Sequence, residues 1–156
     1  MKKHPIIRKP RVVIGMSGGI DSSVAAYLLK KEGYDVVGVF LKLWEPDHEH
    51  YETTRRDNLC CDITSLLRAH TVAAMLDIPL YTINARDTFK EQIVDYYIYE
   101  YEHGRTPNPC VRCNKMIKFG LLWEKAQMLG AQYLATGHHV RLQRTKVKSE
   151  KLQVKS

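Results

Sequence analysis

The chain has 156 residues, of which 44% are hydrophobic and 26% are charged, as expected for one globular domain with a buried core. No apolar run is long enough to cross a bilayer, and the N-terminus lacks the apolar stretch of a signal peptide, so we expect a cytoplasmic protein with no membrane partner. The formal net charge of +7 favours a polyanionic partner such as a nucleic acid, or reflects basic ends that are only solubilising.

The first elements that the pattern predicts are a strand, a glycine-rich turn and a helix. Residues 1–10 are basic and contain two prolines, and we expect them to be a poorly ordered leader. Apolar residues predict a strand over 12–16, and helical spacing predicts a helix over 21–32 that ends at Gly33. The turn between them reads Gly15-Met16-Ser17-Gly18-Gly19, and adjacent glycines let the backbone approach an anion closely. This order of elements indicates a phosphate-binding site.

The polar residues after the glycines refine that interpretation. Ser17, Ser22 and Ser23 add hydroxyl donors to the backbone N–H groups of the helix start. A carboxylate beside phosphates is repulsive unless a cation lies between them, so Asp21 predicts a bridging Mg²⁺; the alternative is that it caps the helix. The turn is neither a Walker loop nor a G-x-G-x-x-G motif. Its Ser-Gly-Gly-x-Asp-Ser-Ser string resembles the signature of the ATP pyrophosphatase (PP-loop) superfamily, which splits ATP into AMP and pyrophosphate.

The middle of the chain predicts a strand, a long loop and a helix. A nearly continuous apolar run predicts a strand over 36–41 that is covered on both faces. Residues 43–59 are polar and read as a long loop, in which we interpret His48 and His50 as solvated side chains rather than metal ligands. Apolar residues at helical spacing predict a helix over 62–77.

A short strand over 80–83 and a helix from about residue 87 to 103 are expected next. Four tyrosines of this helix could stack on nucleic acid, but their spacing wraps around the helix axis. We therefore expect the tyrosines to pack in the core. They are Tyr96, Tyr97, Tyr99 and Tyr101.

The last part of the chain predicts one more helix and strand. Residues 104–114 read GRTPNPCVRCN, and the glycine and two prolines predict no regular element there. A helix over 115–129 and a strand over 133–135 follow. Because strands alternate with helices, we predict an α/β fold, a doubly wound parallel sheet with helices on both faces. Ligands of such sheets bind at the carboxyl ends of the strands, where three segments converge on one nucleotide site: residues 17–23, 41–44 and 137–138.

The four cysteines form two pairs, Cys60-Cys61 and Cys110-x-x-Cys113. In the cytoplasm they are not expected to form structural disulfides. The second pair precedes a helix, and Arg112, Lys115 and the helix N-terminus would favour the thiolate form of a cysteine, which indicates a reactive thiol. A C-x-x-C pair is equally half of a zinc site or part of an iron–sulfur site, with Cys60-Cys61 as the other half.

Four blocks of sequence resemble, in order, the tRNA-specific 2-thiouridylases of the MnmA type. The resemblance covers about residues 11–142 and implies an adenine nucleotide alpha hydrolase-like PP-loop ATPase domain, flanked by the leader 1–10 and a basic tail 143–156. It implies a tRNA-uridine 2-sulfurtransferase. ATP adenylates O2 of the wobble uridine, and a cysteine persulfide then replaces that oxygen with sulfur, releasing AMP. The blocks are GMSGGIDSSVAAYLLKKEGYDVVGVFLKLW, DIPLYTINA, GRTPNPCVRCNKMIKFG and LGAQYLATGHHVR.

The resemblance also implies site residues, cofactors and partners. ATP and Mg²⁺ are the implied cofactors, with tRNA and a sulfur-donor protein as partners. Cys113 matches the first catalytic cysteine, the nucleophile. The positions that match contacts to the target base or the tRNA are Asn108, Pro109, Cys110 and His138. The positions that match ATP contacts are Gly15, Met16, Ser17, Gly18, Gly19, Ile20, Asp21, Ser22, Leu41 and Gly137.

Three departures from the family pattern matter. Leu41 stands where many members have Met, which a backbone contact tolerates. Cys110 stands where many members have Asp, which leaves open an iron–sulfur cluster or Zn²⁺ at Cys110 and Cys113. Family members are much longer, and their persulfide-carrying cysteine lies in the further part, so we expect this chain to be the N-terminal catalytic part, able to bind ATP but not to complete thiolation. The alternatives are an iron–sulfur-dependent tRNA sulfurtransferase, a non-catalytic ATP-binding remnant and a zinc-stabilised RNA-binding domain.

Overall fold

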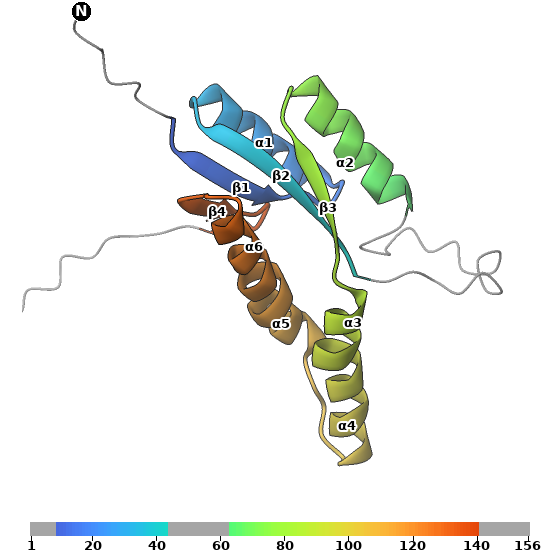
Figure 1. Cartoon of the computed structure of the whole chain (residues 1–156). Helices are drawn as coiled ribbons and strands as arrows, with labels where there is room; N and C mark the ends of the chain where they lie inside the picture. Colours follow the sequence, from blue (N-terminus) through green and yellow to red (C-terminus); the bar gives the residue numbers. More distant parts are fainter. Residues whose placement is uncertain (1–8, 44–62, 141–156) are drawn as a thin grey trace, which may run out of the picture.

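A computed structural model describes residues 9–43 and 63–140, which form one parallel sheet with helices around it (Figure 1). The strand order is β3-β2-β1-β4. In the centre, Val13 of β1 pairs with Val37 of β2 on one side and with Leu134 of β4 on the other, all in parallel register. The strands are β1 (Arg11–Gly15), β2 (Asp35–Lys42), β3 (Leu80–Asn84) and β4 (Tyr133–Ala135).

Helices cover both faces of the sheet because alternate residues of the central strands point to opposite sides. Val12 and Ile14 of β1 pack against Ala26 of α1 (Ile20–Lys31) and Ala69 of α2 (Ile63–Met75) on one face. On the other face, Val13 of β1 and Val37 and Val39 of β2 pack against Leu122 and Ala126 of α6 (Leu122–Met128). The predicted doubly wound parallel α/β fold is confirmed.

The remaining helices extend away from the carboxyl edge of the sheet as an arm (Figure 1). Its first side follows β3 and its second side leads into α6. At the base of the arm a third apolar cluster joins Leu43, Ala85, Ile93, Cys113 and Ile117. The first side consists of α3 (Arg86–Phe89), η2 (Lys90–Asp95) and α4 (Tyr96–Glu102), and the second of α5 (Pro109–Cys113) and the π-helical η3 (Asn114–Leu121).

Two predictions about this arm are wrong. Its tyrosines do not pack in the core, since Tyr99 is 52% and Tyr101 is 55% exposed and α4 contains no buried residue. An arm that projects from the sheet has no second layer to cover it. Residues 104–114 also contain a regular element, because α5 begins at Pro109. A proline at the first helical position needs no N–H partner, and Asn108 caps the helix by accepting a hydrogen bond from the Val111 backbone N–H.

Several predictions concern parts of the chain outside the described residues: the leader up to residue 8, the loop with His48 and His50, the pair Cys60-Cys61 and the basic tail. Within residues 9–43 and 63–140, no helix combines the length and the hydropathy needed to cross a membrane. The first predicted helix is confirmed with a shift of one residue at each end, and Gly33 follows its C-cap with φ of +89°.

Candidate nucleotide site

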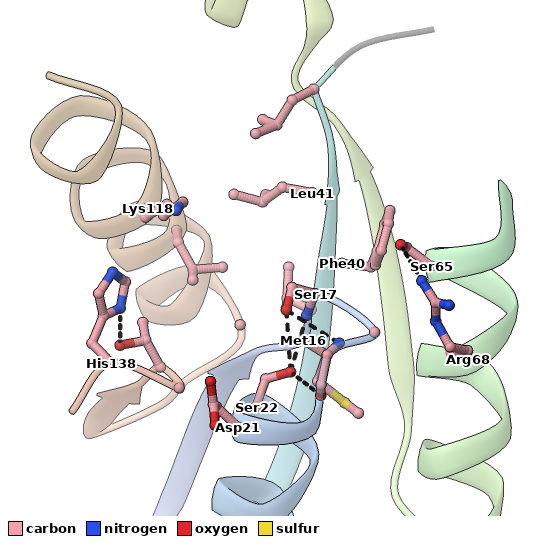
Figure 2. A pocket seen from close by; sticks show the side chains of 18 residues that line it. Met16, Ser17, Asp21, Ser22, Phe40, Leu41, Ser65, Arg68, Lys118 and His138 are labelled. Atoms are coloured by element: carbon pink, nitrogen blue, oxygen red, sulfur yellow. Dashed lines mark hydrogen bonds between the residues drawn. The ribbon is translucent and has the colours of Figure 1, made fainter. Parts of the chain in front are cut away.

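A cavity of about 440 Å³ opens at the carboxyl edge of the sheet, where residues from five separate segments meet (Figure 2). The turn between β1 and α1 forms its floor, the end of β2 and the start of α2 form one side, and η3, α6 and the segment after β4 form the other. The three segments predicted to converge here, at residues 17–23, 41–44 and 137–138, all contribute. Ten predicted site residues line the cavity: Gly15, Met16, Ser17, Gly18, Gly19, Asp21, Ser22, Leu41, Gly137 and His138.

The serines of the β1–α1 turn hold its backbone in shape. Ser22 is 4% exposed, and its Oγ accepts a hydrogen bond from the Ser17 backbone N–H at 3.3 Å while donating to the Gly19 carbonyl at 3.1 Å. Ser23 Oγ donates to the same carbonyl at 2.8 Å. The hydroxyl protons of Ser22 and Ser23 and the backbone N–H groups of Ser17 and Gly19 are therefore used inside the turn. The backbone N–H groups in the first turn of α1 have no partner within the helix and are the donors that suit an anion.

Two glycines allow the turn to lie against its neighbours. Gly18 has φ of +74°, and a Cβ on it would lie 2.1 Å from the backbone oxygen of Ser65 in α2. A Cβ on Gly137 would lie 2.7 Å from the backbone nitrogen of Ser22. The turn is thus held between α2 and the segment after β4, which is a close backbone approach that only glycine permits.

Asp21 lies at the rim of the cavity with a 65% exposed side chain. Its carboxylate Oδ1 is 3.3 Å from Nε2 of His139, and α1 has no side-chain cap hydrogen bond, so the capping interpretation of Asp21 is wrong. Mg²⁺ in phosphate sites is commonly bound by one or two carboxylates together with the substrate phosphates. A single exposed carboxylate beside the turn fits that role. No three potential metal ligands cluster within residues 9–43 and 63–140.

Two cations that sequence reasoning missed also line the cavity, Arg68 of α2 and Lys118 of η3. Arg68 Nη2 donates a hydrogen bond to Ser65 Oγ at 3.0 Å. Lys118 belongs to the IKFG string of the third resembling block, but nothing in that string says which way its side chain faces. Recognising either residue requires knowing that α2 and η3 flank the same end of the sheet.

Three predicted contacts with the target base or the tRNA lie outside the cavity lining. Asn108, Pro109 and Cys110 form the start of α5 in the arm, where Cys110 is exposed. His138 does line the cavity. Its Nδ1 lies 2.8 Å from Thr136 Oγ1, and its ring centroid lies 5.4 Å from that of Phe119. Ile20, a predicted ATP contact, is 81% exposed and is not among the lining residues.

Cys113 is 9% exposed and does not line the cavity. It lies in the helix rather than in a loop, and Arg112 beside it is engaged elsewhere, with its Nε donating to the Gln92 carbonyl and its guanidinium 3.8 Å from the Tyr96 ring. Leu43 belongs both to the cavity wall and to the apolar cluster that holds Cys113. The thiol is therefore buried in a cluster that shares one residue, Leu43, with the cavity wall.

A parallel sheet whose first strand passes through a glycine turn into a helix N-terminus, with cations on both sides, defines a phosphate-binding α/β domain. Residues 10–156 match the family model described as the tRNA methyl transferase HUP domain. The chain belongs to that family.

Named relatives agree with the resemblance read from the motifs. The chain is 53% identical over 135 residues to a tRNA-specific 2-thiouridylase MnmA of Clostridium perfringens, which covers 86% of this chain and 37% of that protein. It is 54% identical over 132 residues to the protein of the same name in Clostridium acetobutylicum, covering 85% and 36% respectively. The resemblance to tRNA-specific 2-thiouridylases is confirmed, and the chain spans little more than a third of the length of these relatives.

A solved structure supports the fold alone. The glutamine-dependent NAD⁺ synthetase of Acinetobacter baumannii, solved in complex with ADP, aligns with a TM-score of 0.54 and 16% sequence identity. The alignment covers 80% of this chain and 21% of that one. The two proteins share an architecture.

Proposed function

We propose that this chain carries the ATP-dependent step in the 2-thiolation of the wobble uridine of tRNA. The observation that carries the proposal is the cavity itself, in which the β1–α1 turn, the end of β2 and the segment after β4 come together. The names of the relatives supply the substrate, since both are tRNA-specific 2-thiouridylases. We further propose a cytoplasmic location, and tRNA and a sulfur-donor protein as partners.

The cavity suits a nucleoside triphosphate in one orientation. The backbone N–H groups where the β1–α1 turn enters α1 would hold the pyrophosphate end, and the exposed carboxylate of Asp21 would hold the bridging Mg²⁺. The base would lie against Leu41 at the end of β2. That leaves the α-phosphoryl group between the turn and the opening lined by His138, where a splayed-out uridine would enter.

The proposed chemistry has two steps. O2 of the uridine attacks the α-phosphorus, an O–P bond forms, and the α–β bridge breaks so that pyrophosphate leaves with the bonding electron pair. Persulfide sulfur then attacks C2, and AMP leaves with the former O2. The Cys113 thiolate then attacks the inner sulfur of the former persulfide. This releases the thiolated base and leaves a disulfide between Cys113 and the cysteine that carried the persulfide.

The burial of Cys113 sets a condition on this second step. The apolar cluster that buries Cys113 must rearrange before the thiol can reach a base in the cavity, because Cys113 is 9% exposed and does not line the cavity. Cys110 lies one helical turn before Cys113 and is exposed. The two thiols together are the pair that could instead ligate a metal or a cluster. The iron–sulfur or zinc alternative at Cys110 and Cys113 is separated from the proposal by metal analysis of the purified chain.

Nucleotide binding and pyrophosphate exchange test the proposal. We expect the chain to bind ATP more tightly with Mg²⁺ than with chelator, and Asp21→Asn to remove most of that difference. Glu124→Gln, on α6 and outside the cavity, is the matched control and should behave as wild type. Exchange of labelled pyrophosphate into ATP that requires tRNA would support adenylation. A chain that binds no ATP under either condition would exclude the proposed function.

A further inference from the structure

The predicted ATP contacts include no cation that would compensate the negative charge of a triphosphate. A triphosphate carries several negative charges and Asp21 adds another, yet none of the residues predicted to contact ATP carries a permanent positive charge. Charges held close together in a partly enclosed site need compensation. Among the residues lining the cavity, Arg68 and Lys118 are the permanent cations.

These two cations lie on opposite walls. Figure 2 shows Arg68 on the α2 side and Lys118 on the η3 side, with the turn bearing Ser17 and Ser22 between them. The separation along the sheet edge indicates that they serve different parts of one extended ligand rather than a single phosphate.

Arg68 is tied to the turn that would hold the pyrophosphate. Its Nη2 donates to Ser65 Oγ at 3.0 Å, and the Ser65 backbone lies directly against Gly18. Within residues 9–43 and 63–140 this is the one hydrogen bond of the guanidinium group, which has five N–H donors and so has others to offer a ligand. Arg68 is therefore held beside the tip of the turn.

Lys118 lies on the other wall. It shares the wall with His138 and faces Leu41 across the cavity (Figure 2). No ion pair or hydrogen bond joins its ammonium group to another residue in the part of the chain that the structure describes. An ammonium group is a mobile point charge with three donors, suited to an anionic centre whose geometry changes during reaction.

We propose that these two cations divide the triphosphate between them, with Arg68 contacting the departing pyrophosphate and Lys118 contacting the α-phosphoryl group. This assignment rests on the proposed function. When uridine O2 attacks the α-phosphorus, negative charge grows on the non-bridging α-oxygens, where Lys118 offsets it. As the α–β bridge breaks, the electron pair goes to pyrophosphate, where Arg68 and Mg²⁺ receive the charge.

Calorimetric binding of three ligands separates the two roles. ATP, AMP and pyrophosphate, each with Mg²⁺, are titrated into wild type, Lys118→Met and Arg68→Met, which keep an unbranched apolar stem but remove the charge. Lys118→Met is expected to weaken ATP and AMP at least tenfold and to change pyrophosphate less than about twofold. Arg68→Met is expected to weaken ATP and pyrophosphate at least tenfold and to leave AMP within about twofold.

The controls keep the result interpretable. Lys115→Met removes an exposed charge from the same η3 segment outside the cavity lining and should bind all three ligands as wild type does. Urea unfolding of each variant checks that the fold is intact. Equal weakening of AMP and pyrophosphate by both variants, or no weakening by either, overturns the division of roles. If wild-type chain binds no ATP, the proposed function fails instead, so the two failures are distinguishable.

Discussion

At the scale of single residues, Gly18 shows how one missing side chain shapes the site. Its φ of +74° is accessible to glycine at little cost, and its hydrogen faces the backbone of Ser65 where a methyl group would overlap the carbonyl oxygen. Gly33 also has a positive φ, +89°, but nothing lies within 4 Å of its missing Cβ. A side chain at Gly33 would therefore meet backbone strain alone, whereas one at Gly18 would meet both backbone strain and a steric overlap with Ser65.

Gly18→Ala should destabilise the fold and impair nucleotide binding together. A non-glycine residue in left-handed conformation costs about 1–2 kcal/mol, and the overlap with Ser65 adds displacement of the turn, so we expect ATP affinity to fall at least tenfold. Gly33→Ala should lose a similar free energy of unfolding from strain alone and keep wild-type affinity. Urea unfolding and calorimetry on both variants give the comparison. Normal ATP binding by Gly18→Ala would contradict the packing of the turn.

The thiols of Cys110 and Cys113 should differ in reactivity. Cys110 is exposed, whereas Cys113 is buried in the cluster with Leu43 and Ile117, and a reagent must wait for local opening to reach it. We expect Cys110 to be alkylated at least about tenfold faster than Cys113. Peptide mass mapping measures the rate at each site. Leu43→Ala should speed the labelling of Cys113 and leave that of Cys110 unchanged. Equal rates in the wild-type chain would show that the apolar cluster does not protect the thiol.

At the scale of elements, the arm is held by polar contacts at its far end. The turn after α4 is closed by Arg105, whose Nε and Nη2 donate to the two carboxylate oxygens of Glu100 at 2.6 and 2.8 Å. The guanidinium group of Arg105 also lies 5.7 Å from the Tyr99 ring centroid. A bidentate pair of this kind fixes geometry better than a single contact.

This pair gives the arm a pH dependence with a definite sign. Hydrogen bonding to Arg105 lowers the pKa of Glu100 from its ordinary value of 4.5. The folded state therefore favours the ionised carboxylate, and its contribution to stability is present above the unfolded pKa and lost as the pH falls through the lowered folded pKa. An NMR titration should place the Glu100 midpoint below 4.5. Arg105→Met should return it towards the ordinary value, and a wild-type midpoint above 4.5 would contradict the pairing.

At the scale of the whole molecule, stability is unevenly distributed. Val13, Ile14 and Val39 in the centre of the sheet are fully buried, and helices cover them on both faces. The arm contributes the small cluster at its base, and α4 buries no residue. Regions with few buried apolar contacts open at lower free energy than the core.

Hydrogen exchange should reveal this gradient. We expect the amides of β1 and β2 to exchange only through global unfolding, and those of α4 to exchange at least about a hundredfold faster through local opening. Mass spectrometry of peptides from each region measures both rates in one experiment. ATP should slow exchange at residues 15–23 without protecting α4. Equal protection of α4 and β1 would mean that the arm is part of the cooperative core.

Particular residues show how far the sequence predicted the fold and the site. The apolar run of β1 and the glycines after it depend on neighbours in the chain, so the pattern alone predicts the turn and the first helix. The alternation of strands with helices predicts the parallel α/β class. The glycine and prolines of residues 104–114 predict no regular element, but Pro109 occupies the first position of α5, with Asn108 as its cap. The tyrosines of α4 were placed in a core because helical spacing says nothing about whether a second layer exists.

By itself, the sequence determined the glycine turn between the first strand and the first helix, the parallel α/β class and the resemblance to tRNA-specific 2-thiouridylases, because each depends on residues adjacent in the chain. Only the tertiary structure decided that Arg68 and Lys118 line one cavity, that Asp21 meets His139, and that Cys113 is buried in an apolar cluster outside the cavity lining. These relations depend on how α2, η3 and the segment after β4 pack around the carboxyl edge of the sheet. Packing between elements distant in sequence is set by the burial of whole surfaces, which no local pattern encodes.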